Sequence, residues 1–582
     1  MKPAATFLLL CLACHAHAQT ISVADFGVRA NSFADAVEGV KQAIAACKVQ
    51  PGAALVFPKG RYDFYPDSAE KREYYISNTS SETECPSKVK TIGLLFEDMK
   101  NLTIEGNGSR FVLHGKMISW AFIRCENVLL QNIAVDFERP TISELAFAEV
   151  SPSRVVVNVH PDSKYDLIDG KLCFYGEKWT MRSTFSILTD SVEGTALYSS
   201  FDPLREGRAT ELSPNRLSVE GSFGGTNYKV GKTLTIRDPD RDHVGALVSN
   251  SVNVRLKNID MHFMHGLGIV SQFSENLAYT RVSVSPSRGR TIASFADGMH
   301  FSGCRGHILV DSCRFKGLHD DPMNVHGTYL RITAQPSPQT VVVRFMHSQT
   351  YGFQAFYERD AVAFIHAPSL QLRGMAVVKN VRRISEREML LELSAPLPSG
   401  VGVSDCIENL TWTPSLTVRN CRFEMTNTRG LLVTTPRKVV IEDNHFYRTG
   451  MYAIQISGDA GSWYESGAVR DVTIRRNIFE ECGYNRGWRD SYAIAVNPEV
   501  HELVEGRYVH RNIRILNNVF KLLDGLALKA KSVDGLTFKG NAVGRSAWTP
   551  PLRSASDPSE NPAGPFLLES CKNVEILNNS SE

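Results

Sequence analysis

Short runs in which apolar and polar residues alternate recur along most of this chain. Residues 513–520 are typical and read IRILNNVF, an alternating stretch followed by Asn and then by an apolar pair. A period of two residues predicts a β-strand with one buried face, and Asn tolerates the left-handed backbone angles of a tight bend. Runs of the same form occupy residues 128–133, 252–259, 307–315, 416–423, 439–446, 472–479, 536–541 and 574–578.

The spacing of these runs predicts stacked coils. Asn420 and Asn444 are 24 residues apart, as are Asn517 and Asn541, and the other gaps are longer, as expected for coils that carry loops. A single coil cannot bury its apolar face, but neighbours stacked on it can. The spacers lack the helical periodicity of a leucine-rich repeat and the four strands of a propeller blade. We therefore predict a right-handed parallel β-helix.

One helix is predicted near the start of the chain, over residues 34–47, where apolar residues recur at spacings of three and four. It follows residues 23–28 and precedes residues 52–62. The open apolar end of a solenoid must be capped, and a helix at this place would cover it.

Two stretches interrupt the coil pattern and read as antiparallel strands joined by turns. Each has the size of a small β-barrel, and structureless loops of that length are uncommon. The predicted fold is all-β, with two inserted β-barrels and an N-terminal capping helix. The predicted divisions are a signal peptide at 1–18, the cap and first coils at 19–140, a β-barrel at 141–242, coils with the catalytic cluster at 243–328, a second β-barrel at 329–405 and C-terminal coils at 406–582.

The first 18 residues are typical of a signal peptide. Lys2 gives the positive start, residues 7–13 form an apolar run too short to span a bilayer, and Ala16 and Ala18 give the small-x-small cleavage pattern. We therefore expect export to the periplasm or the medium, with cleavage after Ala18. Lipid attachment at Cys14 is an alternative that the sequence leaves open.

Composition narrows the choice of partner. The net charge is +2 on 64 basic and 62 acidic residues, which argues against a nucleic acid or a strongly anionic polymer held by charge alone. Ten cysteines remain after the signal peptide, without Cys-x-x-Cys or zinc spacing, and those in strand patterns, such as Cys313 and Cys421, are predicted to be buried small hydrophobes. A neutral substrate fits best, and no metal or other cofactor is expected.

The densest polar cluster lies between the two insertions, at residues 295–301 and 316–327. Asp297 and Asp320 are 23 residues apart, about one coil, so they are predicted to lie on neighbouring rungs about 4.8 Å apart. Strand alternation predicts that only one of Asp320 and Asp321 faces the same way as Asp297. Glycoside hydrolysis needs one protonated and one ionised carboxyl group, and closely packed acids raise the pKa of one of them. Asp297, Asp320 and Asp321 are therefore the predicted catalytic residues.

Other polar and aromatic residues are candidates for substrate binding. The main alternative interpretation of this cluster is a metal site, but the spacing of its residues suits neither calcium nor a transition metal. For the aromatic loops, simple packing is the competing interpretation. The candidates are His300, His319, Asn324 and His326 in the cluster, and Trp463, Arg486 and Trp488 in two later loops.

Two resemblances add to this interpretation. The N-terminal block, with DFG at residues 25–27 and VFPKGRY at 56–62, resembles the pectin-lyase-like β-helix superfamily, which holds many different activities. The cluster, with ADGMHF at 296–301 and HDDPMNVHG at 319–327, resembles glycoside hydrolase family 110.

The second resemblance implies a specific function. Members of that family are inverting exo-α-galactosidases that act mainly on terminal α-1,3-linked galactose, as in blood group B, and consist of a β-helix with two inserted barrels. The resemblance places the catalytic acids on Asp297, Asp320 and Asp321, with Asp297 as general acid and one of the other two as base. It implies a glycan substrate and makes a homodimer plausible. Whether the acceptor is branched or linear stays open.

Two other classes of function remain as alternatives. One is a non-catalytic glycan-binding β-helix such as an adhesin, and the other is a different polysaccharide hydrolase or lyase of the same superfamily. A polygalacturonase would carry Asn-Thr-Asp and Gly-His-Gly motifs, and the sequence has neither.

Overall fold

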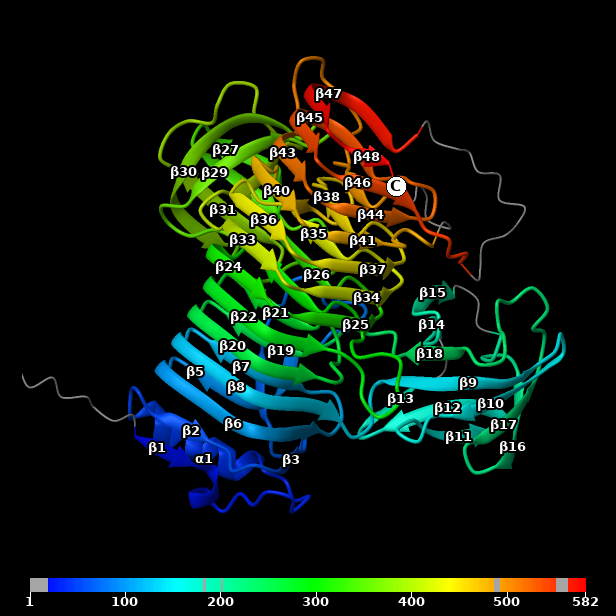
Figure 1. The fold of residues 1–582 in the computed structure, drawn as a ribbon. Helices are drawn as coiled ribbons and strands as arrows, with labels where there is room; N and C mark the ends of the chain where they lie inside the picture. Colours follow the sequence, from blue (N-terminus) through cyan, green and yellow to red (C-terminus); the bar gives the residue numbers. More distant parts are fainter. Residues whose placement is uncertain (1–18, 182–184, 200–202, 486–491, 551–563, 582) are drawn as a thin grey trace, which may run out of the picture.

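The structure, a computed structural model, describes residues 19–181, 185–199, 203–485, 492–550 and 564–581. It is a parallel β-helix with two antiparallel insertions and one N-terminal helix, which confirms the predicted fold class (Figure 1). The helix α1 (Val37–Lys48) begins three residues later than predicted. At its start, the Val37 backbone N–H donates a hydrogen bond to Asp35 Oδ1 at 3.0 Å.

Helix α1 covers the N-terminal end of the solenoid. Its buried face consists of Val37, Val40, Ala43, Ile44 and Cys47, and it packs on the first strands. This face closes the apolar end of the coils, as expected for a solenoid cap. The N-terminal elements are β1 (Thr20–Ser22), the 3-10 helix η1 (Val23–Phe26), β2 (Ala54–Val56), β3 (Arg61–Phe64), β4 (Glu70–Glu73), β5 (Val89–Glu97), β6 (Lys100–Leu113), β7 (Ile118–Ile123) and β8 (Glu126–Phe137).

The central coils carry the predicted catalytic cluster. Each strand pairs in parallel with the equivalent strand of the next coil; Leu256, for example, pairs with Leu130 on one side and Tyr279 on the other. The strands are β19 (Ala246–Ser249), β20 (Val252–Met261), β21 (Ile269–Gln272), β22 (Glu275–Val284), β23 (Met299–Ser302), β24 (Arg305–Asp311), β25 (Arg314–Leu318) and β26 (Met323–Thr328).

The C-terminal coils continue the same stacks. Their strands are β33 (Pro414–Arg419), β34 (Arg422–Thr426), β35 (Leu431–Val433), β36 (Lys438–Glu442), β37 (His445–Thr449), β38 (Ile454–Ile456), β39 (Glu465–Ser466), β40 (Asp471–Arg475), β41 (Ile478–Glu480), β42 (Ile494–Val496), β43 (His510–Leu516), β44 (Val519–Leu522), β45 (Leu528–Lys539), β46 (Ala542–Arg545), β47 (Phe566–Leu577) and β48 (Ser580–Ser581).

Asparagines bond along the axis at two kinds of position. In the NN pair of the typical run, Asn517 takes the left-handed bend with φ 53°, whereas Asn518 points inward. The inward residues form a buried ladder in which each Nδ2 donates to the next Oδ1, at 3.0 Å from Asn477 to Asn518 and 2.9 Å from Asn518 to Asn541. The ladder satisfies polar groups that each bend would otherwise leave unpaired in the core.

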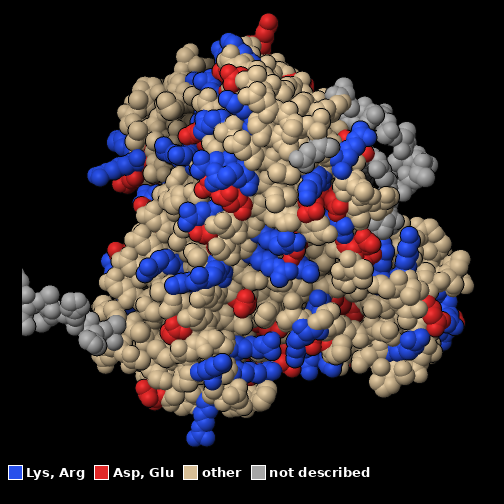
Figure 2. Space-filling view, in the orientation of Figure 1, with Lys and Arg blue, Asp and Glu red and all other residues tan. Residues whose placement is uncertain are grey.

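Charged side chains of both signs are interspersed over the face shown in Figure 2. Oppositely charged side chains also pair between coils: Arg419 contacts Asp311 at 2.8 Å, and Arg476 contacts Asp443 at 2.7 Å. This pairing agrees with the nearly balanced charge of the sequence.

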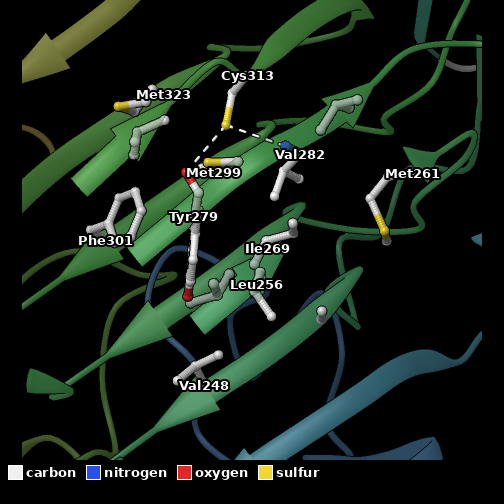
Figure 3. Close-up of a cluster of buried hydrophobic side chains, with 14 of the residues drawn as sticks. Val248, Leu256, Met261, Ile269, Tyr279, Val282, Met299, Phe301, Cys313 and Met323 are labelled. Carbon is white, nitrogen blue, oxygen red and sulfur yellow. Dashed lines mark hydrogen bonds between the residues drawn. The ribbon is translucent and has the colours of Figure 1, made fainter. Parts of the chain in front are cut away.

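The interior of the coils is apolar and closely packed. Figure 3 shows Tyr279 beside Phe301, with ring centroids 5.6 Å apart, and Cys313 between coils. The Cys313 Sγ contacts the Tyr279 carbonyl at 3.4 Å and accepts from the Val282 N–H at 3.4 Å. Cys313 and Cys421 are both buried free thiols, as the strand pattern predicted.

The first insertion forms two antiparallel sheets in the part of it that the structure describes. One sheet has seven strands in the order β15-β14-β18-β9-β10-β17-β16, and the other has three, β11-β12-β13. The bounds are β9 (Ile142–Val150), β10 (Arg154–Val159), β11 (Lys164–Ile168), β12 (Lys171–Gly176), β13 (Trp179–Met181), β14 (Phe185–Asp190), β15 (Thr195–Ser199), β16 (Arg208–Ser213), β17 (Arg216–Glu220) and β18 (Thr233–Arg237).

The second insertion is a closed six-stranded barrel in the order β27-β28-β31-β30-β29-β32. Its own apolar core includes Phe345, Phe356 and Phe364. The strands are β27 (Leu330–Ser337), β28 (Thr340–Arg344), β29 (Ala361–His366), β30 (Gln371–Arg383), β31 (Glu388–Leu393) and β32 (Cys406–Asn409). Within the described residues, no helix is long and apolar enough to cross a membrane.

Candidate active site

A cavity of about 190 Å³ lies over the central coils, where β21, β23, β26 and β35 follow one another along the axis. Coil residues form its floor, and segments from distant parts of the chain form its walls. The lining residues are Asn78, Arg241, Leu267, Asp297, His300, Asp320, Asp321, Asn324, Arg429, Leu432, Val433, Thr434, Gln455, Ser457, Gly458, Asp459, Ser462, Trp463, Glu465 and Glu499.

The three predicted aspartates all line this cavity. Met299 pairs with Met323 in the strand register, which places Asp321, rather than Asp320, next to Asp297 on the neighbouring coil. The expectation that only one of Asp320 and Asp321 faces the same way as Asp297 is wrong. Both residues lie in the bend before β26, where strand alternation does not apply.

The glycine after Asp297 allows the two coils to approach closely. A Cβ on Gly298 would lie 2.6 Å from the Pro322 carbonyl oxygen, closer than side-chain carbons are found. The Gly298 N–H donates to the Asp321 carbonyl at 3.0 Å. The Asp-Gly pair therefore brings Asp297 against the next coil.

Asp297 is deeply buried, with 4% of its surface exposed, and Asp321 is buried to a similar degree, with 2% exposed. Asp297 Oδ2 lies 2.9 Å from His300 Nδ1. Burial, together with the nearby carboxyls of Asp320 and Asp321, raises the pKa of Asp297 well above its usual range, and Arg241 only partly opposes this. The surroundings of Asp297 therefore favour its protonated form.

Asp321 is held by a single arginine. Its Oδ1 accepts from Arg429 Nε at 3.0 Å and from the Arg429 backbone N–H at 3.1 Å, and its Oδ2 accepts from Arg429 Nη2. Burial raises the pKa of Asp321 to about 6; Arg429 acts in the opposite direction and Asp320 in the same one. Both carboxylate oxygens are thus engaged by the protein.

Asp320 is less restrained. Its side chain is 31% exposed, and its contact with Arg241 Nη1 is 3.8 Å long. Arg241 comes from the segment that leads out of the first insertion. Asp320 therefore has carboxylate oxygens available to the cavity.

The predicted binding residues of the cluster take three different positions. His300 and Asn324 line the cavity, and His326 lies behind His300, with its Nε2 2.9 Å from the Nε2 of His300. His319 faces the first insertion, where its Nε2 lies 2.7 Å from Thr235 Oγ1, and it is not among the lining residues. It follows β25 in a bend, so its neighbours in sequence do not set its direction.

The later loops are placed only in part. Trp463 lines the cavity, is 41% exposed and stacks on His347 of the barrel, with ring centroids 4.3 Å apart. Asp459 holds this loop by accepting backbone N–H groups, including that of Ser462 at 2.8 Å. Arg486 and Trp488 lie outside the described residues.

Glu465 is a carboxylate of the cavity lining that the sequence did not indicate. Glu465 Oε1 accepts from Asn78 Nδ2 at 2.9 Å and from Asn324 Nδ2 at 3.2 Å. In the sequence, Trp463 and Tyr464 indicate that this loop contacts the substrate, but no local pattern indicates a role for Glu465 itself. Its partners come from positions far apart in the sequence.

One group of side chains of the types that bind metals is present among the described residues, and it lies outside the cavity lining. It consists of Asp242, His243 and His265. Both ring nitrogens of His265 already have partners, Asp242 Oδ1 at 2.7 Å and Thr141 Oγ1 at 2.7 Å. Lys116 Nζ lies 3.6 Å from Asp242 Oδ2, so the positive charge of the lysine already lies beside this carboxylate.

Comparison with family models identifies all three parts of the fold. Residues 143–234 match GLAA-B beta-barrel domain I, residues 340–407 match GLAA-B beta-barrel domain II, and residues 400–581 match the right-handed beta helix region.

Curated relatives are similar over nearly the whole length. Alpha-1,3-galactosidase A of Bacteroides fragilis is 44% identical over 96% of this chain and 92% of its own. Alpha-1,3-galactosidase B of Bacteroides thetaiotaomicron is 36% identical over 99% of this chain and 93% of its own. Among solved structures, an exopolygalacturonase from Thermotoga maritima covers 86% of this chain and 87% of its own, at 11% identity and a TM-score of 0.37.

Proposed function

The chain belongs to the family of α-1,3-galactosidases, glycoside hydrolase family 110, and we propose that it removes terminal α-1,3-linked galactose from glycans with inversion at the anomeric carbon. The linkage comes from the names of the relatives. One observation carries the chemistry: a deeply buried carboxyl, Asp297, shares one cavity with a partly exposed carboxyl, Asp320, of the next coil.

In the proposed reaction Asp297 is the general acid. It donates its proton to the glycosidic oxygen while the bond between that oxygen and C1 of galactose breaks. Water attacks C1 from the opposite face, and a carboxylate of the Asp320–Asp321 pair takes one of its protons. The products are β-galactose and the shortened glycan; Asp297 ends as a carboxylate and the base as an acid, and exchange with solvent restores both.

The contacts favour Asp320 as the base. A base must keep a free lone pair for the water proton, and Arg429 occupies both oxygens of Asp321. Asp320 has only the long contact with Arg241. In this assignment Asp321 fixes Arg429 at the cavity, and its charge helps to keep the proton on Asp297.

The shape of the cavity supports action on a terminal sugar. It is small, and the exposed Trp463 offers an aromatic face of the kind that packs against the apolar face of a sugar. The branched blood group B epitope and linear α-1,3-galactose are both proposed substrates.

Substrate specificity tests this proposal. We expect the purified protein to release galactose from an α-1,3-galactobiose and from the blood group B trisaccharide, and not from α-1,4- or α-1,6-galactobiose. Asp297→Asn should lose this activity while keeping the thermal unfolding temperature of the wild type. Retention of intact oligosaccharide without release of galactose would instead identify a glycan-binding protein, and an unsaturated product that absorbs ultraviolet light would identify a lyase.

Two further expectations remain proposals. Export with cleavage after Ala18 predicts a mature N-terminus at Gln19, which N-terminal sequencing of protein recovered from the periplasm or medium would detect. A homodimer is proposed from the resemblance alone, and light scattering measures its mass directly.

A further inference from the structure

A short loop of the second insertion lies behind the cavity wall. It joins β28 to β29 of the barrel, and three of its side chains contact residues that line the cavity although they are not themselves among the lining residues. His347 stacks on Trp463, Gln349 accepts a hydrogen bond from Arg241, and Thr350 Oγ1 donates to Asn78 Oδ1 at 2.9 Å. One loop of the barrel therefore supports the cavity at three places.

Gln349 joins a cation of the cavity lining to an anion of the N-terminal region. Its Oε1 accepts from Arg241 Nη2 at 2.5 Å, and its Nε2 lies 2.9 Å from each carboxylate oxygen of Glu84. A side-chain amide accepts at its oxygen and donates at its nitrogen, so each end of Gln349 faces a partner of the matching kind.

Glu84 is fixed in turn by its own neighbours. Its Oε2 accepts from the Ser81 backbone N–H at 2.8 Å and from Ser81 Oγ at 3.0 Å. Burial acts to raise the pKa of Glu84, but hydrogen bonds from Ser81 and Gln349 outweigh it and hold the pKa below its ordinary value. Because Glu84 stays a carboxylate, a reversed amide would place two acceptors against each other. The oxygen of Gln349 is therefore kept on Arg241.

Arg241 brings this fixed orientation to the catalytic carboxyls. Its side chain is 12% exposed, and its Nη1 lies 3.8 Å from Asp320 Oδ2. Its guanidinium lies 6.0 Å from the centroid of the Trp463 ring. Both contacts are too long to orient a guanidinium, whereas the hydrogen bond to Gln349 is short. The other charged groups around Arg241 are Glu84, Arg237 and Asp297.

We propose that Gln349 is a positioning residue that holds the guanidinium of Arg241 beside Asp320, so that a loop of the second insertion controls the catalytic carboxyls from outside the cavity lining. The inference rests on the proposed function of the cavity, and it holds whether Asp320 gives or takes a proton. A cation held at one place favours the charged form of nearby carboxyl groups, and a guanidinium that moves away does so less.

A purely structural role is the competing interpretation, because Gln349 also joins the barrel to the N-terminal region. A second hydrogen bond, from the Tyr75 hydroxyl to Glu386 Oε1 at 2.8 Å, joins the same two parts of the molecule. Neither Tyr75 nor Glu386 is a lining residue. Tyr75→Phe removes this bond and keeps the ring, so it is the matched control for docking of the barrel.

The kinetic test compares these two variants. Gln349→Met keeps the length of the side chain and removes both hydrogen bonds of the amide. We expect kcat/KM on α-1,3-galactobiose to fall about tenfold, mainly through kcat, because a small misplacement near the reacting groups is costly. Both limbs of the pH profile should move about 0.5–1 unit to higher pH. Tyr75→Phe should match the wild type, and an unmoved profile in Gln349→Met, or the same change in Tyr75→Phe, would overturn the inference.

A double-mutant cycle tests whether the effect passes through Arg241. In the Arg241→Met variant there is no guanidinium to hold, so adding Gln349→Met should change the residual kcat/KM by less than about twofold. A further tenfold loss in the double variant would show that Gln349 acts by another route, and the inference would be wrong.

Nitrogen-15 NMR of the arginine-labelled full chain gives an answer that needs no activity. A held guanidinium rotates slowly and gives separate signals for its two Nη groups, and Arg241→Lys assigns those of Arg241. We expect separate signals in the wild type and in Tyr75→Phe, and one averaged signal in Gln349→Met. An averaged signal in the wild type, or separate signals in Gln349→Met, would overturn the inference. Wild-type protein that releases no galactose would instead refute the proposed function, and the NMR result would still decide whether Gln349 holds Arg241.

Discussion

At the scale of single residues, three aspartates of one cavity differ in their surroundings. Asp297 is buried beside a histidine, Asp321 is bound by Arg429 on both oxygens, and Asp320 is partly exposed. Burial and neighbouring acids favour the neutral form of a carboxyl, which separates the acid from the base within one site.

This difference predicts how two neighbouring substitutions behave. Asp320→Asn removes the proposed base, and kcat should fall about 10²–10⁴-fold with little change in unfolding temperature. Added azide should then yield β-galactosyl azide, because it needs no base. Kinetics and NMR of the product check both points, and wild-type activity in Asp320→Asn would contradict the assignment.

Asp321→Asn is the matched comparison, and its main effect should be on stability. It removes the carboxylate that pairs with the partly exposed guanidinium of Arg429, which should cost about 1–3 kcal/mol of unfolding free energy. Urea denaturation measures this cost. If Asp321→Asn unfolds like the wild type while only its kcat falls, Asp321 rather than Asp320 is the better candidate for the base.

The pH dependence follows from the direction of the Asp297 pKa. A general acid works only while protonated, so kcat/KM should fall as pH rises through the raised pKa of Asp297. The acidic limb belongs to the base, which must be ionised. In a pH series on α-1,3-galactobiose, the residual activity of Asp297→Asn should lack the alkaline limb of the wild type; an alkaline limb that persists unchanged would show that another group is the acid.

At the scale of elements, local pattern predicted the coils well because strand alternation and bend chemistry are properties of neighbouring residues. The buried ladder is less visible in the sequence. In the pair Asn517–Asn518, identical residues take different roles, one in the left-handed bend and one inside the core. Which Asn points inward depends on the stacking of coils, so only the assembled structure shows it.

The ladder makes a prediction about stability. Asn477 is fully buried, donates to the Ile441 carbonyl at 2.9 Å and accepts from the Asn444 N–H at 3.0 Å. Asn477→Ala would leave both backbone groups unpaired and should cost about 2–5 kcal/mol in urea denaturation. Asn253→Gly is the control, because this exposed residue near the start of β20 has φ 56° and glycine accepts that angle. Equal losses in both variants would show that the internal ladder has no special weight.

At the scale of the whole molecule, segments distant in sequence complete the cavity that the coils begin. Arg241 comes from the end of the first insertion, His347 from the barrel, and Asn78 from the N-terminal region. The sequence predicted the aspartates because they lie about one coil apart, but it gave no sign of Glu465, whose partners Asn78 and Asn324 lie 387 and 141 residues away. The direction of His319 was missed for a similar reason, since it packs against the first insertion.

The stacked pair Trp463–His347 joins the barrel to the cavity and should contribute to substrate binding. His347→Ala removes the support of the indole, and we expect KM on α-1,3-galactobiose to rise about 2–10-fold with kcat nearly unchanged. Steady-state kinetics measure both constants. His366→Ala, on the same barrel but outside the cavity lining, is the control, and an equal rise in KM there would argue against a specific role for the stack.

The central claim is that Asp297 and a carboxylate of the next coil act on opposite sides of one anomeric carbon, with a water molecule as nucleophile. Proton NMR of the first galactose released from α-1,3-galactobiose tests this most directly, because it records the anomer before mutarotation. The account predicts β-galactose as the initial product, converting later to the equilibrium mixture. Initial α-galactose would contradict it and would indicate a covalent intermediate on one of the aspartates.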